Sequence, residues 1–145
     1  RMHNHEHFMQ LALVEGRKAI ALCQDNPPVG CVLVRHGTVI AAGHTNAPGG
    51  PHAEAMALLQ LQDTAADVIA YVTLEPCSFH GRTPSCARAF VTAGINTVYI
   101  GIIDPDPRNN GRGVELLRSA GVTVEVGVLA AQASAELLPY LGKAR

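Results

Sequence analysis

Hydrophobic and polar residues follow two repeats along this chain, one typical of helices and one typical of strands. Between Phe8 and Leu22 the apolar residues recur at helical spacing, and the DNPP segment that follows ends this predicted helix because residues before proline avoid helical dihedral angles. The segment 30–44 has the pattern of two strands joined by a turn at His36 and Gly37. This pattern predicts a β-hairpin.

The rest of the chain alternates short apolar runs with segments of strong helix formers. We expect strands over 67–74, 97–103 and 122–128, and helices over 52–62, from Cys86 to about 93, 114–120 and 130–141. Strands joined by helices favour parallel pairing with helices on both faces of the sheet. The pattern therefore predicts one α/β domain over 1–145, a three-layer α/β/α sandwich around a mixed five-stranded sheet.

The amino-acid composition argues against disordered, membrane-spanning and broadly nucleic-acid-binding proteins. The chain is 48% hydrophobic and 16% charged with a formal net charge of −1, so it is globular and has no broad basic surface for nucleic acid. No apolar run is long enough to span a membrane, and the polar start RMHNHEHF lacks a signal-peptide core. We expect a cytoplasmic protein whose histidine-containing start is frayed rather than a metal site.

The four cysteines divide into two pairs. In a cytoplasmic protein all four should be reduced, and Cys23 in the helical pattern and Cys31 in a strand pattern are expected to be buried small hydrophobic residues. Cys77 and Cys86 fit neither pattern. They need another explanation.

Two short motifs lie just after predicted strands, where sheets of this kind usually build their sites. The first has His52 and Glu54 at a helix start, and the second is Pro76-Cys77 followed by Cys86. One histidine and two cysteines give three protein ligands, which leaves the fourth position of a catalytic zinc for water. Glu54 would transfer the proton of that water, and H-x-E followed by P-C…C is the signature of zinc deaminases.

Three segments carry a resemblance to a known family. GGPHAEAMAL, AYVTLEPCSFHGRTPSC and DPDPRNNGRG resemble the deaminase domain of the riboflavin-biosynthesis deaminase/reductase, within the cytidine-deaminase-like superfamily. The eight residues between the cysteines are the specific feature, since other deaminases have P-C-x-x-C. The resemblance implies parallel pairing of the last two strands and deamination of a phosphoribosyl pyrimidine precursor of riboflavin. It implies zinc held by His52, Cys77 and Cys86, Glu54 as the proton shuttle, and substrate binding by Asn26, Arg82, Asp104 and Asp106.

The sequence also departs from the family pattern. Phe79 and Thr45 stand near positions where the family has histidine, Asp106 replaces an asparagine, and RNNG (108–111) replaces a small apolar stretch. A carboxylate only accepts hydrogen bonds, whereas an amide also donates them, so the change alters what a pocket recognises. The family's reductase domain is not part of these 145 residues, and a separate reductase is one expectation.

Four functions are compatible with these residues. The leading one is the riboflavin-precursor deaminase, with a small-molecule substrate and a homodimeric assembly. A stand-alone deaminase of another nucleobase, nucleoside or metabolite is the alternative that the departures favour. A nucleic-acid-editing deaminase is disfavoured by three Tyr, three Phe and no Trp, and a non-catalytic zinc domain is disfavoured by Glu54.

Overall fold

The predicted elements are present in the predicted order. The computed structural model describes residues 2–81 and 84–142. The elements are α1 (Met2–Arg17), β1 (Gly30–Arg35), β2 (Thr38–His44), α2 (Ala53–Leu58), β3 (Val68–Leu74), α3 (Cys86–Ala93), β4 (Thr97–Ile102), α4 (Arg112–Ser119), β5 (Thr123–Val126), α5 (Ala130–Leu137) and the 3₁₀ helix η1 (Leu138–Tyr140).

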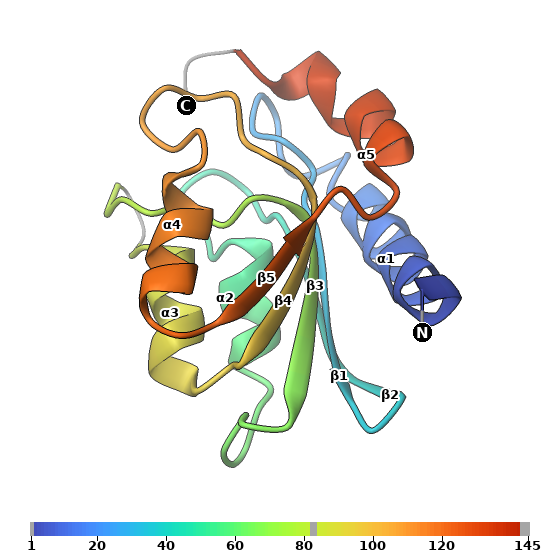
Figure 1. Cartoon of the computed structure of the whole chain (residues 1–145). Helices are drawn as coiled ribbons and strands as arrows, with labels where there is room; N and C mark the ends of the chain where they lie inside the picture. The colour runs from blue at the N-terminus through green and yellow to red at the C-terminus, as the bar shows by residue number, and fades with distance from the viewer. Residues whose placement is uncertain (1, 82–83, 143–145) are drawn as a thin grey trace.

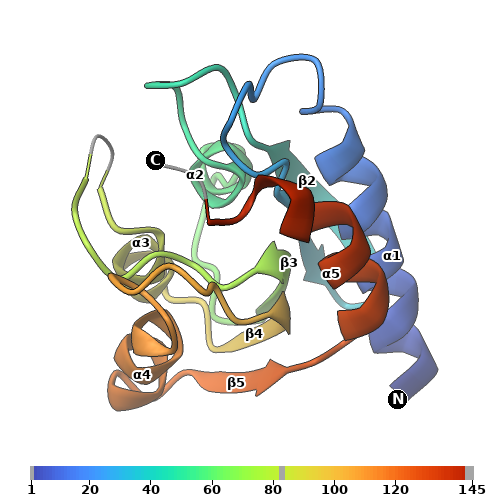
Figure 2. The same cartoon turned by 90° about the horizontal axis from the view of Figure 1, so that it is seen from above.

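The five strands form one mixed sheet in the order β2-β1-β3-β4-β5. Strand β1 is antiparallel to both β2 and β3, whereas β3, β4 and β5 are parallel to one another. Helices α1 and α5 cover one face and α2, α3 and α4 cover the other (Figures 1 and 2). The three-layer sandwich and the parallel pairing of β4 with β5 are confirmed.

The central strands are buried on both faces. Val32 and Tyr71 belong to a hydrophobic cluster with Met9 of α1, whereas their neighbours Leu33 and Val72 belong to a second cluster that includes residues of the other helices. Adjacent residues of a strand point to opposite faces, so each strand contributes side chains to both layers. This accounts for the nearly continuous apolar run of β3. Among the described helices none is long and apolar enough to cross a membrane.

The first helix differs from the prediction at both ends. It starts at Met2 and stops at Arg17, and residues 18–22 form turns in which Ala19 N–H donates to Gly16 C=O at 3.0 Å and Leu22 N–H donates to Ala19 C=O at 2.8 Å. These bonds join residues three apart. Apolar residues spaced by three fit such turns as well as a helix, which is why the pattern extended the helix too far. Cys23 is buried as predicted, but outside the helix. Helix α2 is likewise shorter than predicted.

The start of the chain is helical rather than frayed. His5 Nδ1 lies 2.8 Å from the Tyr71 hydroxyl oxygen, and its ring stacks on Tyr99 at a centroid distance of 4.1 Å. Tyr71 and Tyr99 also stack on each other at 5.1 Å. Through His5, the N-terminal part of α1 is therefore packed against Tyr71 of β3 and Tyr99 of β4. The expectation of a frayed terminus is therefore wrong.

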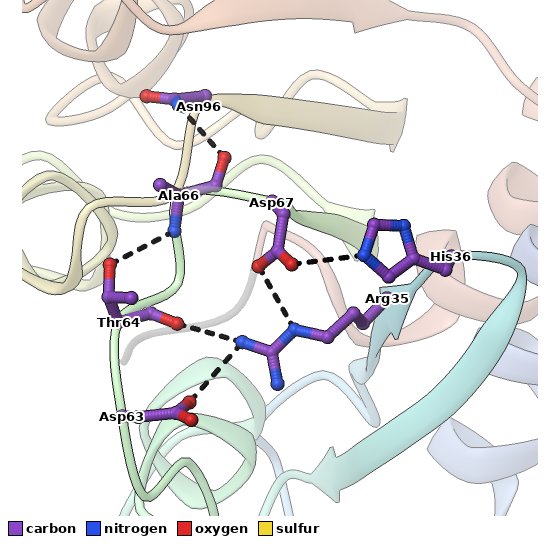
Figure 3. Close-up of polar contacts among 7 residues, drawn as sticks. All are labelled: Arg35, His36, Asp63, Thr64, Ala66, Asp67 and Asn96. Carbon is purple, nitrogen blue, oxygen red and sulfur yellow. Dashed lines mark hydrogen bonds and ion pairs between the residues drawn. The ribbon is translucent and has the colours of Figure 1, made fainter.

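A polar network closes the end of the sheet that lies away from the carboxyl ends of the parallel strands (Figure 3). The Arg35 guanidinium donates to Asp67 at 2.9 Å and to the carbonyl of Thr64 at 2.7 Å. His36 contacts the other oxygen of Asp67 at 3.3 Å, and the Asn96 amide donates to the carbonyl of Ala66 at 2.9 Å. The hairpin turn is thereby joined to the loop that enters β3.

Helix α2 and the turn after it close part of the outer edge of β2. The Gln60 amide donates to the carbonyl of Ala42 at 2.6 Å, and its oxygen accepts from the Ala42 N–H at 3.4 Å. Two residues further along β2, the backbone N–H of His44 donates to Met56 Sδ at 3.4 Å. The backbone groups at this part of the edge are thus satisfied by side chains.

The His5 contacts predict a pH-dependent stability. Burial lowers the pKa of His5 below the ordinary histidine value of about 6.5, so the folded chain favours the neutral ring. The contribution is therefore present above about pH 6.5 and is lost as the pH falls, because the unfolded chain binds the proton more tightly. Chemical denaturation of wild type and His5→Phe between about pH 7 and pH 5 should show a smaller loss of stability in the variant.

The exposed neighbour His7 provides the control. His7→Phe should lose stability with falling pH as wild type does. Equal pH dependence in His5→Phe and wild type would contradict the assignment.

Candidate active site

Helix α2 lies so close to β2 that only glycine fits at position 43. A Cβ on Gly43 would lie 2.1 Å from the carbonyl oxygen of Ala53 and 2.8 Å from the nitrogen of Ala57. Ala53 and Ala57, both in α2, are fully buried. Small residues on both elements therefore fix the position of the first turn of α2. That turn carries His52 at its N-cap position and Glu54 two residues later.

Cys77 and Cys86 are brought together by the start of α3. Cys77 lies in the loop that follows β3, and Cys86 is the first residue of α3. The Ser85 hydroxyl donates to the carbonyl of Cys77 at 2.8 Å and accepts from the N–H of Arg88 at 3.2 Å. The backbone N–H of Cys86 points at Cys77 Sγ at 3.3 Å. The eight residues between the cysteines thus leave the site as a loop and return to it.

The three predicted metal ligands converge. The ligand atoms of His52, Cys77 and Cys86 all lie within 4.8 Å of one another, and Cys86 Sγ is 3.4 Å from His52 Nδ1. Bond lengths of about 2.3 Å for Zn–S and about 2.0 Å for Zn–N place the ligands of a tetrahedral zinc at separations of this size. Two sulfurs and one imidazole nitrogen are also donors that zinc prefers. The residues present fit a zinc ion with one open position.

The ionisation of the two cysteines favours a cation between them. The hydrogen bond with Cys86 lowers the pKa of Cys77 to about 4, despite the opposing effect of burial. The same hydrogen bond and burial raise the pKa of Cys86 well above its usual value. Without a cation the pair therefore shares one proton, because two adjacent thiolates repel each other. A divalent cation removes that repulsion and allows both sulfurs to ionise.

Glu54 is a buried carboxyl beside this group. Its side chain is only 5% exposed, and burial raises its pKa to about 7, although the charge of His52 opposes the shift. A carboxyl with a pKa near neutrality can both accept and return a proton at physiological pH. His52, Glu54 and Cys77 all line the same cleft of about 420 Å³.

Glu75 organises the loops around the cleft, and the sequence analysis did not identify it. Its buried carboxylate accepts backbone hydrogen bonds from Asp104 at 3.1 Å, Gly111 at 3.0 Å and Val114 at 3.0 Å. The carboxylate thus holds the loop after β4 and also binds the first turn of α4, where free N–H groups favour an anion. The only signal in the sequence was a charged residue at the end of an apolar strand, in TLEPC.

Asn109 is a second buried polar residue that the sequence analysis did not identify. Its side-chain oxygen Oδ1 accepts from the backbone N–H groups of Ser78 at 3.2 Å and Gly113 at 3.1 Å. Its side-chain nitrogen Nδ2 donates to the backbone carbonyl of Pro76 at 3.2 Å. The loop that carries Cys77 is therefore bonded on both sides of the cysteine to the loop before α4.

Two of the predicted substrate-binding residues line the cleft. Asn26 lies on the loop before β1, and Asp104 follows β4. The Asn26 loop is held by Thr45, whose hydroxyl donates to the carbonyl of Pro27 at 2.8 Å and accepts from the N–H of Val29 at 2.9 Å. Thr45, one of the departures from the family pattern, therefore supports the cleft wall.

The other two predicted substrate-binding residues are Arg82 and Asp106. Arg82 lies outside the described residues. Asp106 is not among the described residues that line the cleft, and its carboxylate is bonded instead to Arg108, which does line it. The guanidinium of Arg108 also lies 4.6 Å from the centroid of the Phe79 ring. Arg108 is a cleft residue that the sequence analysis did not single out.

Fold and site together define a class of protein. A His-Cys-Cys donor set beside a buried glutamate, at the carboxyl end of a mixed sheet between helix layers, defines the zinc-dependent deaminases. The chain belongs to the family described as the cytidine and deoxycytidylate deaminase zinc-binding region, which matches residues 2–102.

Individual relatives narrow the class. The chain is 44% identical over 123 residues to the riboflavin biosynthesis protein RibD of Aquifex aeolicus, which covers 85% of this chain and 35% of that protein. Its fold matches Acinetobacter baumannii RibD with a TM-score of 0.91 at 38% identity, over 97% of this chain and 40% of that one.

The name of a third relative, which has a solved structure, states its activity. The diaminohydroxyphosphoribosylaminopyrimidine deaminase/5-amino-6-(5-phosphoribosylamino)uracil reductase of Thermotoga maritima gives a TM-score of 0.90 at 39% identity, over 96% of this chain and 40% of that one. The chain therefore spans well under half the length of these relatives.

The Glu75 network predicts a large effect of a small substitution. Glu75→Gln keeps the shape but replaces one acceptor oxygen with an NH₂ group that faces a backbone N–H. Because an unsatisfied buried donor costs about 1–3 kcal/mol, the free energy of unfolding should fall by about 2 kcal/mol or more in denaturant titrations.

Glu115, an exposed residue in the first turn of α4, supplies the matched control. Glu115→Gln removes the same charge at the same helix end and should change stability by less than about 0.5 kcal/mol. Equal losses in the two variants would show that the buried hydrogen bonds are not the cause.

Proposed function

We propose that this chain is a zinc-dependent deaminase that hydrolyses the amino group of a phosphoribosyl pyrimidine precursor of riboflavin and releases ammonia. The observation that carries the proposal is the convergence of His52, Cys77 and Cys86 within 4.8 Å, with Glu54 in the wall of the same cleft. The identity of about two fifths to RibD proteins, 44% in one case, supports the choice of substrate.

His52, Cys77 and Cys86 would hold the metal. Zinc bound there supplies Lewis-acid chemistry that makes water nucleophilic at neutral pH. The buried position of Cys86 and the hydrogen bond from its N–H to Cys77 Sγ hold the two sulfurs in an oriented arrangement. Three protein ligands would leave one position of the metal for water, and His52 and Cys77 both line the cleft.

Glu54 would move the proton. Hydrolysis breaks the C–N bond and forms a C–O bond, so the proton lost by the attacking water has to reach the departing nitrogen. A carboxyl whose pKa burial raises to about 7 can take the first proton and deliver it to the leaving group. Glu54 is positioned for this because the close contact of α2 with Gly43 fixes its turn of helix.

The remaining predictions concern the substrate and its surroundings. Asn26 and Asp104 would contact the substrate from opposite loops of the cleft, and roles for Arg82 and Asp106 stay predictions. A reductase acting on the product, a homodimeric assembly and a cytoplasmic location are part of the same proposal. The name of the Thermotoga maritima relative supports the reductase. The assembly and the location remain expectations from the sequence.

A second candidate is a deaminase for a different cyclic substrate. The observation that favours it is that Phe79 and Arg108, two departures from the family pattern, line the cleft and contact each other. Ammonia release from a panel of nucleobases, nucleosides and the phosphoribosyl diaminopyrimidine separates the two candidates. A preference for any other compound would replace the riboflavin assignment.

The metal assignment predicts about one zinc per chain. Cys77→Ala and Cys86→Ala each remove one of three protein ligands, so both variants should lose most of the zinc when it is measured by mass spectrometry of the metal. Cys23→Ala changes a buried cysteine outside the donor set and should keep the zinc. Full occupancy in either ligand variant would refute the assignment.

The role of Glu54 predicts a loss of turnover without a loss of metal. Glu54→Gln preserves size and removes the titrating group, so kcat for ammonia release should fall by at least ~10²-fold, the scale of general acid–base catalysis. Zinc content and thermal stability, measured on the same preparations, should remain close to wild type. Near-normal turnover in a variant that keeps its zinc would rule out the proton-transfer role.

A further inference from the structure

Three departures from the family pattern form one cluster in the folded chain. Asp106, Arg108 and Phe79 come from two loops, one before α4 and one after Cys77. Asp106 accepts three hydrogen bonds from Arg108: Oδ1 from the backbone N–H at 2.9 Å and from Nε at 3.1 Å, and Oδ2 from Nη2 at 2.7 Å. Both oxygens of the carboxylate thus bind the edge of the guanidinium formed by Nε and Nη2.

Phe79, on the loop after Cys77, contacts the face of the Arg108 guanidinium. The central carbon of the Arg108 guanidinium lies 4.6 Å from the centroid of the Phe79 ring, within the range of a cation–π contact. A histidine at position 79 would titrate near neutrality and would support a cation poorly once protonated. The phenylalanine therefore suits the arginine, and the two changes form a matched pair.

Within residues 2–81 and 84–142, the arrangement leaves the other edge of the guanidinium available. The bonds to Asp106 use Nε and Nη2, and Nη1 takes no part in them. Arg108 and Phe79 both line the cleft, together with Cys77 and Asp104. The Asp106 side chain is 11% exposed, whereas that of Arg108 is 51% exposed. The group presented to a bound molecule at this wall is therefore a donor and not the carboxylate of Asp106.

We infer that Arg108 is a specificity-determining residue that binds an oxyanion group of the substrate, held ready by Asp106 and Phe79. The inference rests on the proposed function, under which the oxyanion is the phosphate of the phosphoribosyl group. A guanidinium held on one edge by a carboxylate presents two parallel N–H donors on the other, which suits the oxygens of a phosphate.

The charges at this wall explain why the arginine matters. Asp104 and Asp106 would together repel an oxyanion that approaches the same corner of the cleft, and Arg108 offsets one of the two negative charges. Its removal deletes donors and also takes away a positive charge that interacts with both carboxylates. The effect of a substitution should therefore be confined to substrates that carry the anionic group.

Steady-state kinetics on a matched pair of substrates tests the inference. With the phosphoribosyl diaminopyrimidine, Arg108→Gln should raise KM by ~10-fold or more at nearly unchanged kcat, because charge recognition acts equally on ground and transition states. With the dephosphorylated compound, KM should change by less than about twofold. Phe79→Leu should raise KM for the phosphorylated compound by only ~2- to 5-fold, the scale of an exposed cation–π contact.

The control is Arg112→Gln, which removes the same charge four residues away on an exposed residue that does not line the cleft. It should leave both KM values close to wild type. Equal KM changes for the two compounds in Arg108→Gln, or a change in Arg112→Gln as large as in Arg108→Gln, would overturn the inference.

A binding measurement keeps this inference separate from the proposed function. Calorimetric titration of wild type and Arg108→Gln with ribose 5-phosphate and with ribose needs no turnover. If wild type deaminates neither pyrimidine, the proposed function fails, and weaker binding of ribose 5-phosphate but not of ribose in Arg108→Gln would still support the oxyanion site. Unchanged binding of ribose 5-phosphate would refute it.

Discussion

The buried carboxylate of Glu75 is the constraint on which the site depends. It comes directly after the strand that delivers Cys77, and it binds the backbone of the Asp104 loop and of the first turn of α4. A charged group can remain in this interior only because three N–H groups replace its water. The same bonds fix the distance between the loop that carries Cys77, a proposed metal ligand, and a loop that carries cleft residues. Asn109 adds a second connection between those loops.

Close backbone contacts complete the construction of the site. Gly43 allows α2 to lie on β2, and at Gly113 a Cβ would lie only 1.9 Å from the carbonyl oxygen of Pro76. These two contacts set His52 on one side and Cys77 on the other without long flexible side chains between them. The donor atoms are therefore positioned by backbone packing, which resists displacement more than rotatable side chains do.

Much of this organisation could be predicted from the sequence. The order of the elements followed from the alternation of apolar runs and helix formers, and the histidine, glutamate and two cysteines followed from their places after strands. The end of α1 could not be predicted, since apolar residues spaced by three fit both a helix and the turns at 18–22. Glu75 and Asn109 were missed because their partners are backbone groups distant in sequence. Such partners leave no local pattern.

Arg108 shows a different limit of sequence reasoning. The family resemblance predicts Asp106 as a substrate-binding residue, but its bond to Arg108 leaves Arg108, and not Asp106, in the cleft lining. The role of each residue depends on a contact between two loops, with Phe79 on the second of them. A pattern of single positions does not contain that information.

The side chains along β2 also bear on how this domain can associate. An exposed sheet edge normally invites a strand from another molecule, because its N–H and C=O groups are unpaired. Here Gln60 binds both backbone groups of Ala42, and Met56 accepts from the N–H of His44, so an added strand would have to displace the segment that follows His52. Continuous strand exchange along that half of the edge is thus opposed by the same helix that carries His52 and Glu54. Protection against cross-β aggregation and integrity of the donor set are, in this chain, properties of one short segment.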